Sequence, residues 1–195
     1  FHGRVYALRR IKLSDRNVFV VADVVSSMQI LVTSDTHLET PEPPEPVADA
    51  VGSADAVVHA GDFETDAVLE WFEDRATVHA VHGNADDAAV CDALPRRTTF
   101  EADGVRVCVV HGHRTADVAY EAAETGAHLV VRGHTHTPSY KERAVPTLNP
   151  GSPTRPRTAP PSYGSLVCRD GRFGGSVLTL DGETVIEFGD AEEEL

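Results

Sequence analysis

The stretch Arg132-Gly133-His134-Thr135-His136 decides how this chain is interpreted. It follows residues 128–131, His-Leu-Val-Val, whose apolar character predicts a short buried strand. In extended backbone alternate side chains point the same way, so His134 and His136 are expected to share one side. Open α/β sheets place their chemistry at such strand ends. A lone His-x-His is a weak signal, because two unrelated loop histidines give the same pattern, and its meaning depends on the other strand ends.

The other predicted strand ends carry the same kinds of side chain. Four more apolar segments, residues 28–33, 56–59, 77–81 and 105–110, each run into Asp, Asn or His. The side chains at the five strand ends are Asp35 with His37, Asp62, Asn84, His111, and His134 with His136. Most of them arrive beside a glycine, which permits a sharp turn and close backbone approach. A mixture of Asp, Asn and His without Cys suits Mn, Fe, Ni, Co or Zn. Seven such groups exceed what one ion needs and fit two ions about 3.5–4 Å apart, bridged by one carboxylate.

Helical segments separate these strands. Apolar spacing predicts helices over residues 47–51, 64–74, 86–93 and 116–125, the last closed by Gly126. Residues 96–101 and 105–110 are predicted to form a hairpin, and the chain after residue 137 is β-rich, interrupted by a proline-rich loop over 149–161. The predicted later strands are residues 138–143, 145–148, 165–169 and 175–180, and residues 18–25 are a further candidate. This order favours a mixed sheet core with helices outside.

Composition bounds the kind of protein. A chain of 195 residues with 41% hydrophobic and 25% charged residues suits one folded domain. It contains no run of about 18 apolar residues, so no membrane span is expected. The three cysteines include no Cys-x-x-Cys pair, which favours a reducing, cytoplasmic location over a disulfide framework or a thiolate zinc site.

The net charge of −14 is unusual, and only two of the 17 basic residues, Lys12 and Lys141, are lysine. Duplex nucleic acid is a poor partner for such a surface, because binding to it rests on basic residues. An acidic soluble enzyme accounts for the charge. A sharper hypothesis is adaptation to high salt (a halophilic protein), because the Debye length falls to about 3 Å at 1 M salt.

The ordered set Asp35-x-His37, Gly61-Asp62, Gly83-Asn84, His111-Gly112-His113 and Gly133-His134-Thr135-His136 resembles the calcineurin-like metallophosphoesterases. Within them the chain is similar to the small YfcE-type phosphodiesterases, which the later Asn149-Pro150-Gly151-Ser152 also resembles. The resemblance covers about residues 28–180. It implies an α/β (α+β) fold, a four-layer αββα sandwich with mixed sheets and the site at the strand ends.

The resemblance also implies a ligand set and an activity. Asp35, His37, Asp62 and His136 would hold one ion, and Asp62, Asn84, His111 and His134 the other. The implied enzyme hydrolyses small or nucleotide-like phosphodiesters by attack of a hydroxide bridging two metal ions. Mn²⁺ is favoured, with Ni²⁺, Fe²⁺, Co²⁺ or Zn²⁺ as alternatives. A phosphomonoesterase and a non-catalytic metal-bearing scaffold, as in the retromer subunit of the same fold, remain open alternatives.

The run Gly83-Asn84-Ala85-Asp86 departs from the larger phosphatases of the superfamily, which carry a histidine after Gly-Asn. That histidine can protonate the leaving group, so its absence favours diesters with good leaving groups or recruitment of His113 as the acid. The expected catalytic residues are therefore His113, Asn84 and Asp62. A surface histidine without a catalytic role is the alternative for His113.

Three further expectations concern the rest of the chain. Residues 1–27 are interpreted as an extension upstream of a natural start at Met28, whose deletion leaves activity intact; residues 28–189 form the single domain and residues 190–195 an acidic tail. Asn149 and Ser152 either orient ligands or only make a turn, and Arg155 and Arg157 either reach phosphate or lie in a solvated loop. The expected partner is a small phosphoester, with no membrane contact, and homo-oligomerisation is left open.

Overall fold

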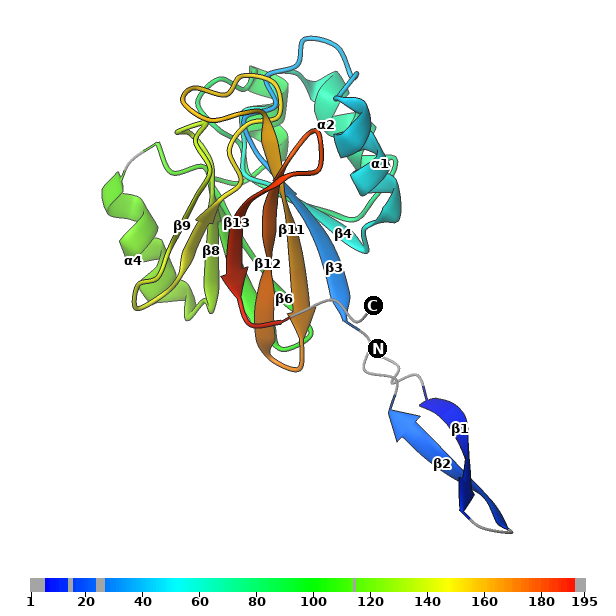
Figure 1. The fold of residues 1–195 in the computed structure, drawn as a ribbon. Helices are drawn as coiled ribbons and strands as arrows, with labels where there is room; N and C mark the ends of the chain where they lie inside the picture. Colours follow the sequence, from blue (N-terminus) through cyan, green and yellow to red (C-terminus); the bar gives the residue numbers. More distant parts are fainter. Residues whose placement is uncertain (1–5, 14–15, 24–26, 114, 192–195) are drawn as a thin grey trace.

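The computed structural model describes residues 6–13, 16–23, 27–113 and 115–191, and two large sheets form its centre (Figure 1). The first contains β3 (Met28–Thr33), β4 (Ala56–His59), β5 (Val78–Ala80), β11 (Ser162–Arg169), β12 (Arg172–Thr179) and β13 (Thr184–Gly189), in the order β13-β12-β11-β3-β4-β5. The second contains β6 (Arg97–Ala102), β7 (Val105–Val110), β8 (Leu129–Arg132), β9 (Ser139–Lys141) and β10 (Thr147–Asn149), in the order β6-β7-β8-β10-β9.

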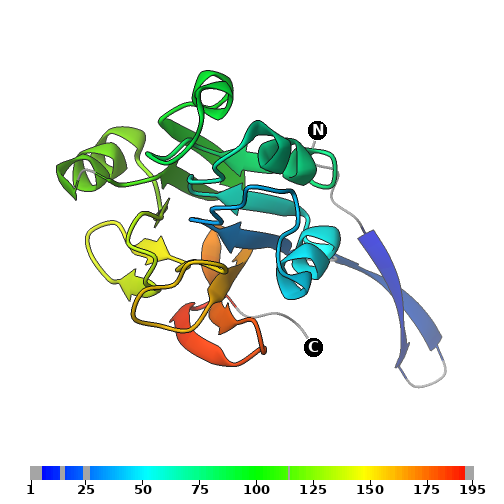
Figure 2. The same ribbon diagram turned by 90° about the horizontal axis from the view of Figure 1, so that it is seen from above.

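Helices cover the outer faces of both sheets. The helices are α1 (Glu45–Ser53), α2 (Asp66–Glu73), α3 (Ala88–Ala93) and α4 (Thr115–Thr125). The first three share an apolar cluster with the outer face of the first sheet, and α4 packs on β7 and β8 of the second. Figure 2 shows α4 on one side of the sheets and α1 on the other. The predicted four-layer αββα arrangement is confirmed. No helix in the described ranges has the length and hydropathy of a membrane span.

The main core lies between the two sheets. Strand alternation sends Ile30 and Val32 of β3 inward to meet Val107 of β7 and Val131 of β8, all fully or almost fully buried. β3, β4 and β5 run parallel, as do β7, β8 and β10. Their carboxyl ends therefore open toward the same edge of each sheet, and the predicted ligands lie directly after these ends.

Two elements differ from the sequence-based expectation. β13 was not predicted, because it is an edge strand whose burial alternates poorly and only Phe188 within it is buried. The candidate strand at residues 18–25 is present as β2 (Arg16–Asp23), and it pairs antiparallel with β1 (Tyr6–Leu13), which was not predicted. Residues 24–25, and residues 192–195 of the predicted acidic tail, lie outside the described residues.

Candidate metal centre

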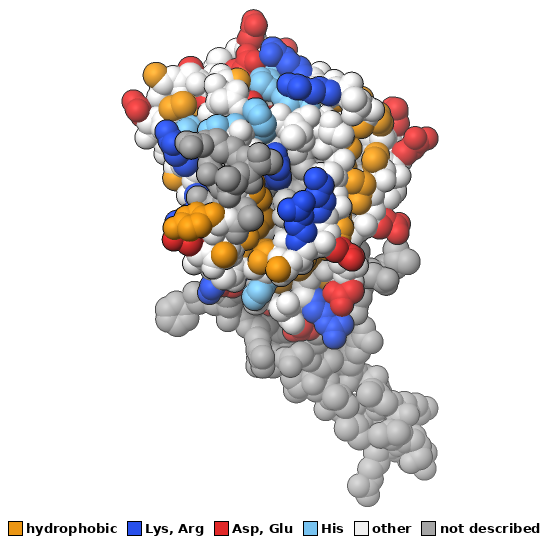
Figure 3. Space-filling view, turned by 90° about the vertical axis from the view of Figure 1, so that its left-hand side faces the viewer, with side chains coloured by type: hydrophobic (Ala, Val, Ile, Leu, Met, Phe, Trp, Pro, Cys, Tyr) orange, Lys and Arg blue, Asp and Glu red, His pale blue; other side chains and the backbone are white. Residues whose placement is uncertain are grey.

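Backbone hydrogen bonds tie the loops after four strands together in two pairs at one end of the domain. The backbone N–H of Asp35 donates to Gly61 O (2.9 Å), that of His37 to Asp62 O (3.0 Å), and that of Gly133 to His111 O (3.1 Å). These bonds join the loop after β3 to the loop after β4, and the loop after β7 to the loop after β8. Figure 3 shows the molecule from the left-hand side of Figure 1, and most of the histidine side chains visible there lie close together near the top.

Four of the predicted ligands form one compact group. One ligand atom from each of Asp35, His37, Asp62 and His136 lies within 4.8 Å of the other three. The Nε2 atoms of His37 and His136 are 3.3 Å apart, and His136 Nε2 is 3.4 Å from Asp35 Oδ1. Asp35, Asp62 and His136 are buried. The group is the size of a first coordination sphere, and it is the set predicted for one ion.

The other predicted set lies beside it. His111 Nε2 is 3.2 Å from Asn84 Oδ1 and 3.3 Å from Asp62 Oδ2, and the ring of His134 has its centroid 5.2 Å from that of His111. Asp62 Oδ2 is also 3.5 Å from His37 Nε2. Asp62 Oδ2 thus approaches one histidine of each predicted set.

Second hydrogen bonds fix the protonation of three of the histidines. Each of His37, His111 and His136 directs Nδ1 at an oxygen that can only accept, so in the neutral form of these rings Nδ1 carries the proton and Nε2 presents a lone pair. The acceptors are Glu64 Oε1 for His37 (2.9 Å), Ala60 O for His111 (2.8 Å) and Arg155 O for His136 (2.6 Å). In that neutral form the Nε2 lone pairs converge with carboxylate and amide oxygens, whereas a protonated His111 donates Nε2–H to Asp62 instead. Such an array of acceptors fits divalent cations.

Burial and mutual charge set the pKa values of the central groups. Burial opposes ionisation of Asp62, but its hydrogen bond and charge interaction with His111 outweigh burial and lower its pKa to about 2. Burial disfavours charged His111, yet the bond to Asp62 raises its pKa above the ordinary value. Burial raises the pKa of Asp35. Burial, followed by the nearby His111, lowers the pKa of His134.

The backbone at residues 132–136 is not extended, so the prediction that His134 and His136 share one side is wrong. Their φ angles are 71° and 55°, and Asp35, His37 and Asp62 also have left-handed φ angles of 54°, 43° and 61°. Asp and His tolerate this region better than branched residues do, and such conformations cluster at functional sites. The left-handed turns send His134 toward His111, whereas His136 stacks on His37 with 4.9 Å between ring centroids. The two histidines therefore lie in different halves of the cluster.

Two glycines allow the close packing of the ligand loops. A Cβ on Gly83 would lie 2.7 Å from Asp62 N and 2.8 Å from Asp62 Cγ, and closer still to Oδ1. A Cβ on Gly133 would lie 2.7 Å from Asp35 Oδ2 and would overlap Ser34 Oγ. The sequence predicts that these glycines let the backbone approach neighbouring loops closely. The structure agrees, because a side chain at either position would displace the Asp62 or Asp35 carboxylate.

Two acidic residues with no role predicted from the sequence hold this cluster in place. The Asp86 carboxylate accepts the backbone N–H groups of Gly83 (2.7 Å), Glu64 (2.9 Å) and Asp62 (3.1 Å). Glu64 accepts from His37 and also pairs with Arg155 Nη1 at 2.8 Å. Asp86 lies within the Gly-Asn-Ala-Asp run, so its position was a usable signal. Glu64 carried none, because only the fold brings it to His37.

Asn149 and Ser152 do more than make a turn. Asn149 Nδ2 donates to Gly133 O and Thr135 Oγ1, both at 2.9 Å, while its Oδ1 accepts from Gly151 N. Ser152 Oγ donates to Asp35 O at 2.7 Å. The loop after β10 therefore supports the loops that carry Asp35 and His134, and both alternatives hold for Asn149.

The other candidate residues lie around this cluster. His113 is exposed at the rim, with its ring centroid 6.1 Å from that of His111 and 6.3 Å from that of His134. The ion pair with Glu64 holds Arg155 beside the cluster, and the Arg155 side chain is 52% exposed. Arg157 is exposed in the same loop. His59 is buried, stacks on Phe63 with 3.5 Å between ring centroids, and accepts the backbone N–H of Gly61 beside Asp62 at 3.2 Å.

Comparisons with known proteins agree on the family. The calcineurin-like phosphoesterase superfamily domain matches residues 28–171. A probable metallophosphoesterase from Methanothermobacter thermautotrophicus is 37% identical over 164 residues, covering 80% of this chain and 88% of the relative. A predicted phosphoesterase from Streptococcus pneumoniae superposes with a TM-score of 0.70 at 30% identity, covering 86% of this chain and all of that one. The structure of an archaeal phosphodiesterase superposes with a TM-score of 0.63 at 25% identity, covering 77% of this chain and all of that one.

Proposed function

The chain belongs to the calcineurin-like phosphoesterase superfamily, and on this basis we propose that it is a metal-dependent phosphodiesterase acting on small or nucleotide-like diesters. The observation that carries the proposal is the position of Asp62 Oδ2 between two groups of acceptors, 3.5 Å from His37 Nε2 and 3.3 Å from His111 Nε2. The similarity to an archaeal phosphodiesterase supports the choice of a diester.

The residues present suit a pair of divalent ions: Asp35, His37, Asp62 and His136 would hold one, and Asp62, Asn84, His111 and His134 would hold the other. When bound, such ions neutralise phosphate oxygens and make water a nucleophile at neutral pH. Mn²⁺ is our favoured metal, because the donors are carboxylate, amide and imidazole groups without thiolate.

The chain's own residues orient these donors and handle the leaving group. Glu64 fixes the tautomer of His37, and Ala85 N–H holds Asp62 Oδ1 at 2.8 Å so that Oδ2 stays directed inward. Ala85 itself offers no acid for the departing alkoxide, which disfavours phosphomonoesters of poor leaving groups. His113, at the exposed rim beside His111 and His134, is our proposed proton donor to the leaving oxygen.

The test compares two model substrates on one protein. Metal-free protein is reloaded with Mn²⁺, Ni²⁺, Co²⁺, Fe²⁺ or Zn²⁺, and hydrolysis of bis(4-nitrophenyl) phosphate is compared with that of 4-nitrophenyl phosphate. We expect faster diester turnover, abolished by Asp62→Asn and by His111→Ala but kept by the matched control His128→Ala, an exposed histidine outside the cluster. Calorimetric titration should give two metal equivalents. Faster monoester turnover would support the phosphomonoesterase, and negligible turnover with every metal would favour the scaffold.

The role of His113 has a separate test. His113→Ala should lower kcat for diesters with alkyl leaving groups and leave 4-nitrophenolate release almost unchanged, because that anion needs no proton to depart. An unchanged kcat for both leaving groups would remove His113 from the mechanism.

We also propose a cytoplasmic location and adaptation to salt. Cys91, Cys108 and Cys168 are all free thiols, which is the state expected in a reducing compartment. The net charge of −14 opposes the compact state through self-repulsion, and salt screens that repulsion. The unfolding temperature should therefore rise steeply from dilute buffer to molar KCl, and a flat salt dependence would contradict the adaptation.

A further inference from the structure

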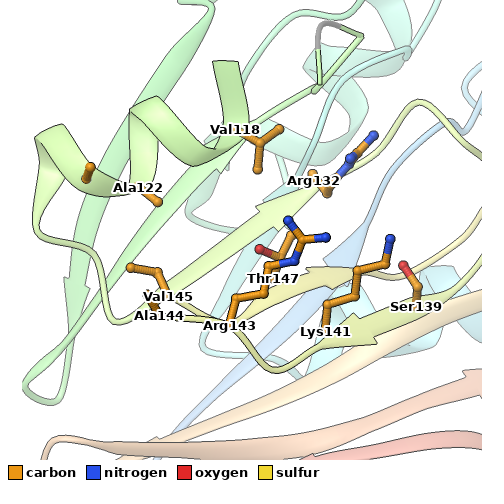
Figure 4. Close-up of a pocket in the computed structure, with 10 residues that line it drawn as sticks. Val118, Ala122, Arg132, Ser139, Lys141, Arg143, Ala144, Val145 and Thr147 are labelled. Atoms are coloured by element: carbon orange, nitrogen blue, oxygen red, sulfur yellow. The ribbon is translucent and has the colours of Figure 1, made fainter. Parts of the chain in front are cut away.

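A cavity of about 320 Å³ lies between α4 and the strands β8, β9 and β10 (Figure 4). Known ligand pockets begin at about 300 Å³, so its size suits a small molecule. The cavity contains none of the predicted metal ligands. Its lining residues include Val118, Ala122, Arg132, Lys141, Arg143 and Val145.

Strand alternation brings two of its cations to one face of the second sheet. On β8, Leu129 and Val131 join the core between the sheets, so Val130 and Arg132 point to the α4 side. On β9, Tyr140 packs toward that same core, so its neighbour Lys141 points away from it. Arg143 follows β9 in the chain. Figure 4 shows Arg132, Lys141 and Arg143 around one space, with Val118 and Ala122 of α4 across from them.

These three cations form no ion pair within the part of the chain that the structure describes. No carboxylate there lies within salt-bridge distance of Arg132, Lys141 or Arg143. Arg132 Nη2 donates to Gly112 O at 3.1 Å, but its Nε is buried without a hydrogen-bond partner. Arg132 is half-buried and interacts electrostatically with Asp35, whereas the Lys141 and Arg143 side chains are exposed and open to a ligand.

The concentration of positive charge is the more notable because the chain is acidic. Acidic residues outnumber basic ones by 31 to 17, yet three basic residues line this one cavity. Figure 3, which views the side that carries α4, shows Lys and Arg side chains near the middle of that face and acidic side chains mainly around its edge. Three cations around one cavity favour an anionic group on a ligand that binds there.

The opposite wall is apolar. Val118 and Ala122 are at most 8% exposed and form a cluster with Val130, and Val145 packs against that cluster. A ligand held here contacts cations at one end and aliphatic side chains at the other. Inorganic phosphate would use only the first of these features, and an uncharged hydrocarbon only the second.

We propose that this cavity is a second ligand site, which binds a small organic anion whose phosphate or carboxylate group is attached to an apolar body. Arg132 joins the site to the metal centre, because it donates to the carbonyl of Gly112, between His111 and His113, and directly precedes Gly133. The proposal concerns binding and stands whether or not the protein hydrolyses diesters.

Calorimetric titration of the metal-loaded protein with phenylphosphonate tests it. A phosphonate can also bind the metal centre, so we expect two sites in the wild-type protein and one in Asp62→Asn. In the Asp62→Asn background only the cavity site remains. Adding Lys141→Met or Arg143→Met there should weaken phenylphosphonate binding by roughly ten- to a hundredfold, the usual loss of a hydrogen bond to a charged group. The matched control Arg172→Met removes an exposed cation outside the cavity and should change nothing. Lys141→Arg should retain binding, and thermal melts check that each variant folds.

Related probes separate the contributions of charge and apolar contact. Benzoate tests whether one negative charge suffices, inorganic phosphate lacks the apolar body, and benzyl alcohol lacks the charge. We expect phenylphosphonate to bind more tightly than phosphate and benzyl alcohol. Phenylphosphonate binding that vanishes in Asp62→Asn but persists in Lys141→Met and Arg143→Met would overturn the proposal, as would equal affinity for benzyl alcohol or no second site at all.

Discussion

Replacing Gly83 by alanine should collapse the metal centre, because Gly83 packs directly against the proposed bridging carboxylate. The added Cβ would lie 2.7 Å from Asp62 N and 2.8 Å from Asp62 Cγ, whereas Cβ atoms essentially never approach within 3.0 Å of other heavy atoms. Neither neighbour can give way easily. Asp62 N is bonded to the Asp86 carboxylate at 3.1 Å, and Asp62 Oδ1 accepts from Ala85 N at 2.8 Å. The clash must therefore be relieved by moving the loop.

The magnitude follows from the cost of overpacking a buried site. Such changes typically cost about 1–3 kcal/mol, and the backbone contact places Gly83→Ala toward the upper end. The same chemical change at Gly52 serves as the matched control. Gly52 lies in α1, and a Cβ there meets nothing within 4 Å. Gly52→Ala should stabilise the protein by about 0.5–1 kcal/mol, the usual helix preference of alanine over glycine.

Two measurements on each variant decide the outcome. Urea unfolding in the presence of a chelator gives the free energy of unfolding without metal, and calorimetric titration gives metal affinity. In Gly83→Ala both metal equivalents should weaken together, because Asp62 Oδ2 lies between both donor groups. A Gly83→Ala protein with wild-type stability and two wild-type metal sites would refute this account. Loss of one equivalent alone would refute the bridging role of Asp62.

Two further predictions concern residues around the cluster. Glu64→Ala removes the acceptor of the His37 Nδ1–H bond (2.9 Å), so metal affinity should fall by about ten- to a hundredfold in calorimetric titration, and an unchanged affinity would contradict the orienting role. Burial lowers the pKa of His59 well below 6.5, so the unfolded state takes up a proton first as pH falls. Proton uptake by the unfolded state lowers the free energy of unfolding. The contribution of neutral, buried His59 is therefore complete above pH 6.5 and is lost toward lower pH, by up to about 1.4 kcal/mol per pH unit. Urea unfolding between pH 5 and 8 should show a shallower pH dependence for His59→Gln than for wild type, and equal slopes would contradict the assignment.

Much of the fold was predictable because local patterns report local structure. Residues 28–33 and 105–110 are apolar runs bounded by turn residues, and they form β3 and β7. β13 escaped prediction because an edge strand buries little and has no strong alternation. The candidate ligands were predictable for a related reason. Parallel strands place the loops at their carboxyl ends along one edge of a sheet, so residue type and order sufficed to bring Asp35 and Asp62 together after β3 and β4.

Residue type and position after a strand were enough to identify the donor side chains and their order along the chain. Their geometry depends on the tertiary structure. His134 and His136 diverge because their backbone is left-handed, and this departs from the extended chain that periodicity assumes. Glu64 reaches His37 across 27 positions of sequence, and Arg132 and Lys141 meet through the pairing of β8, β10 and β9. Such contacts arise from chain pairing and loop packing, which no local pattern encodes.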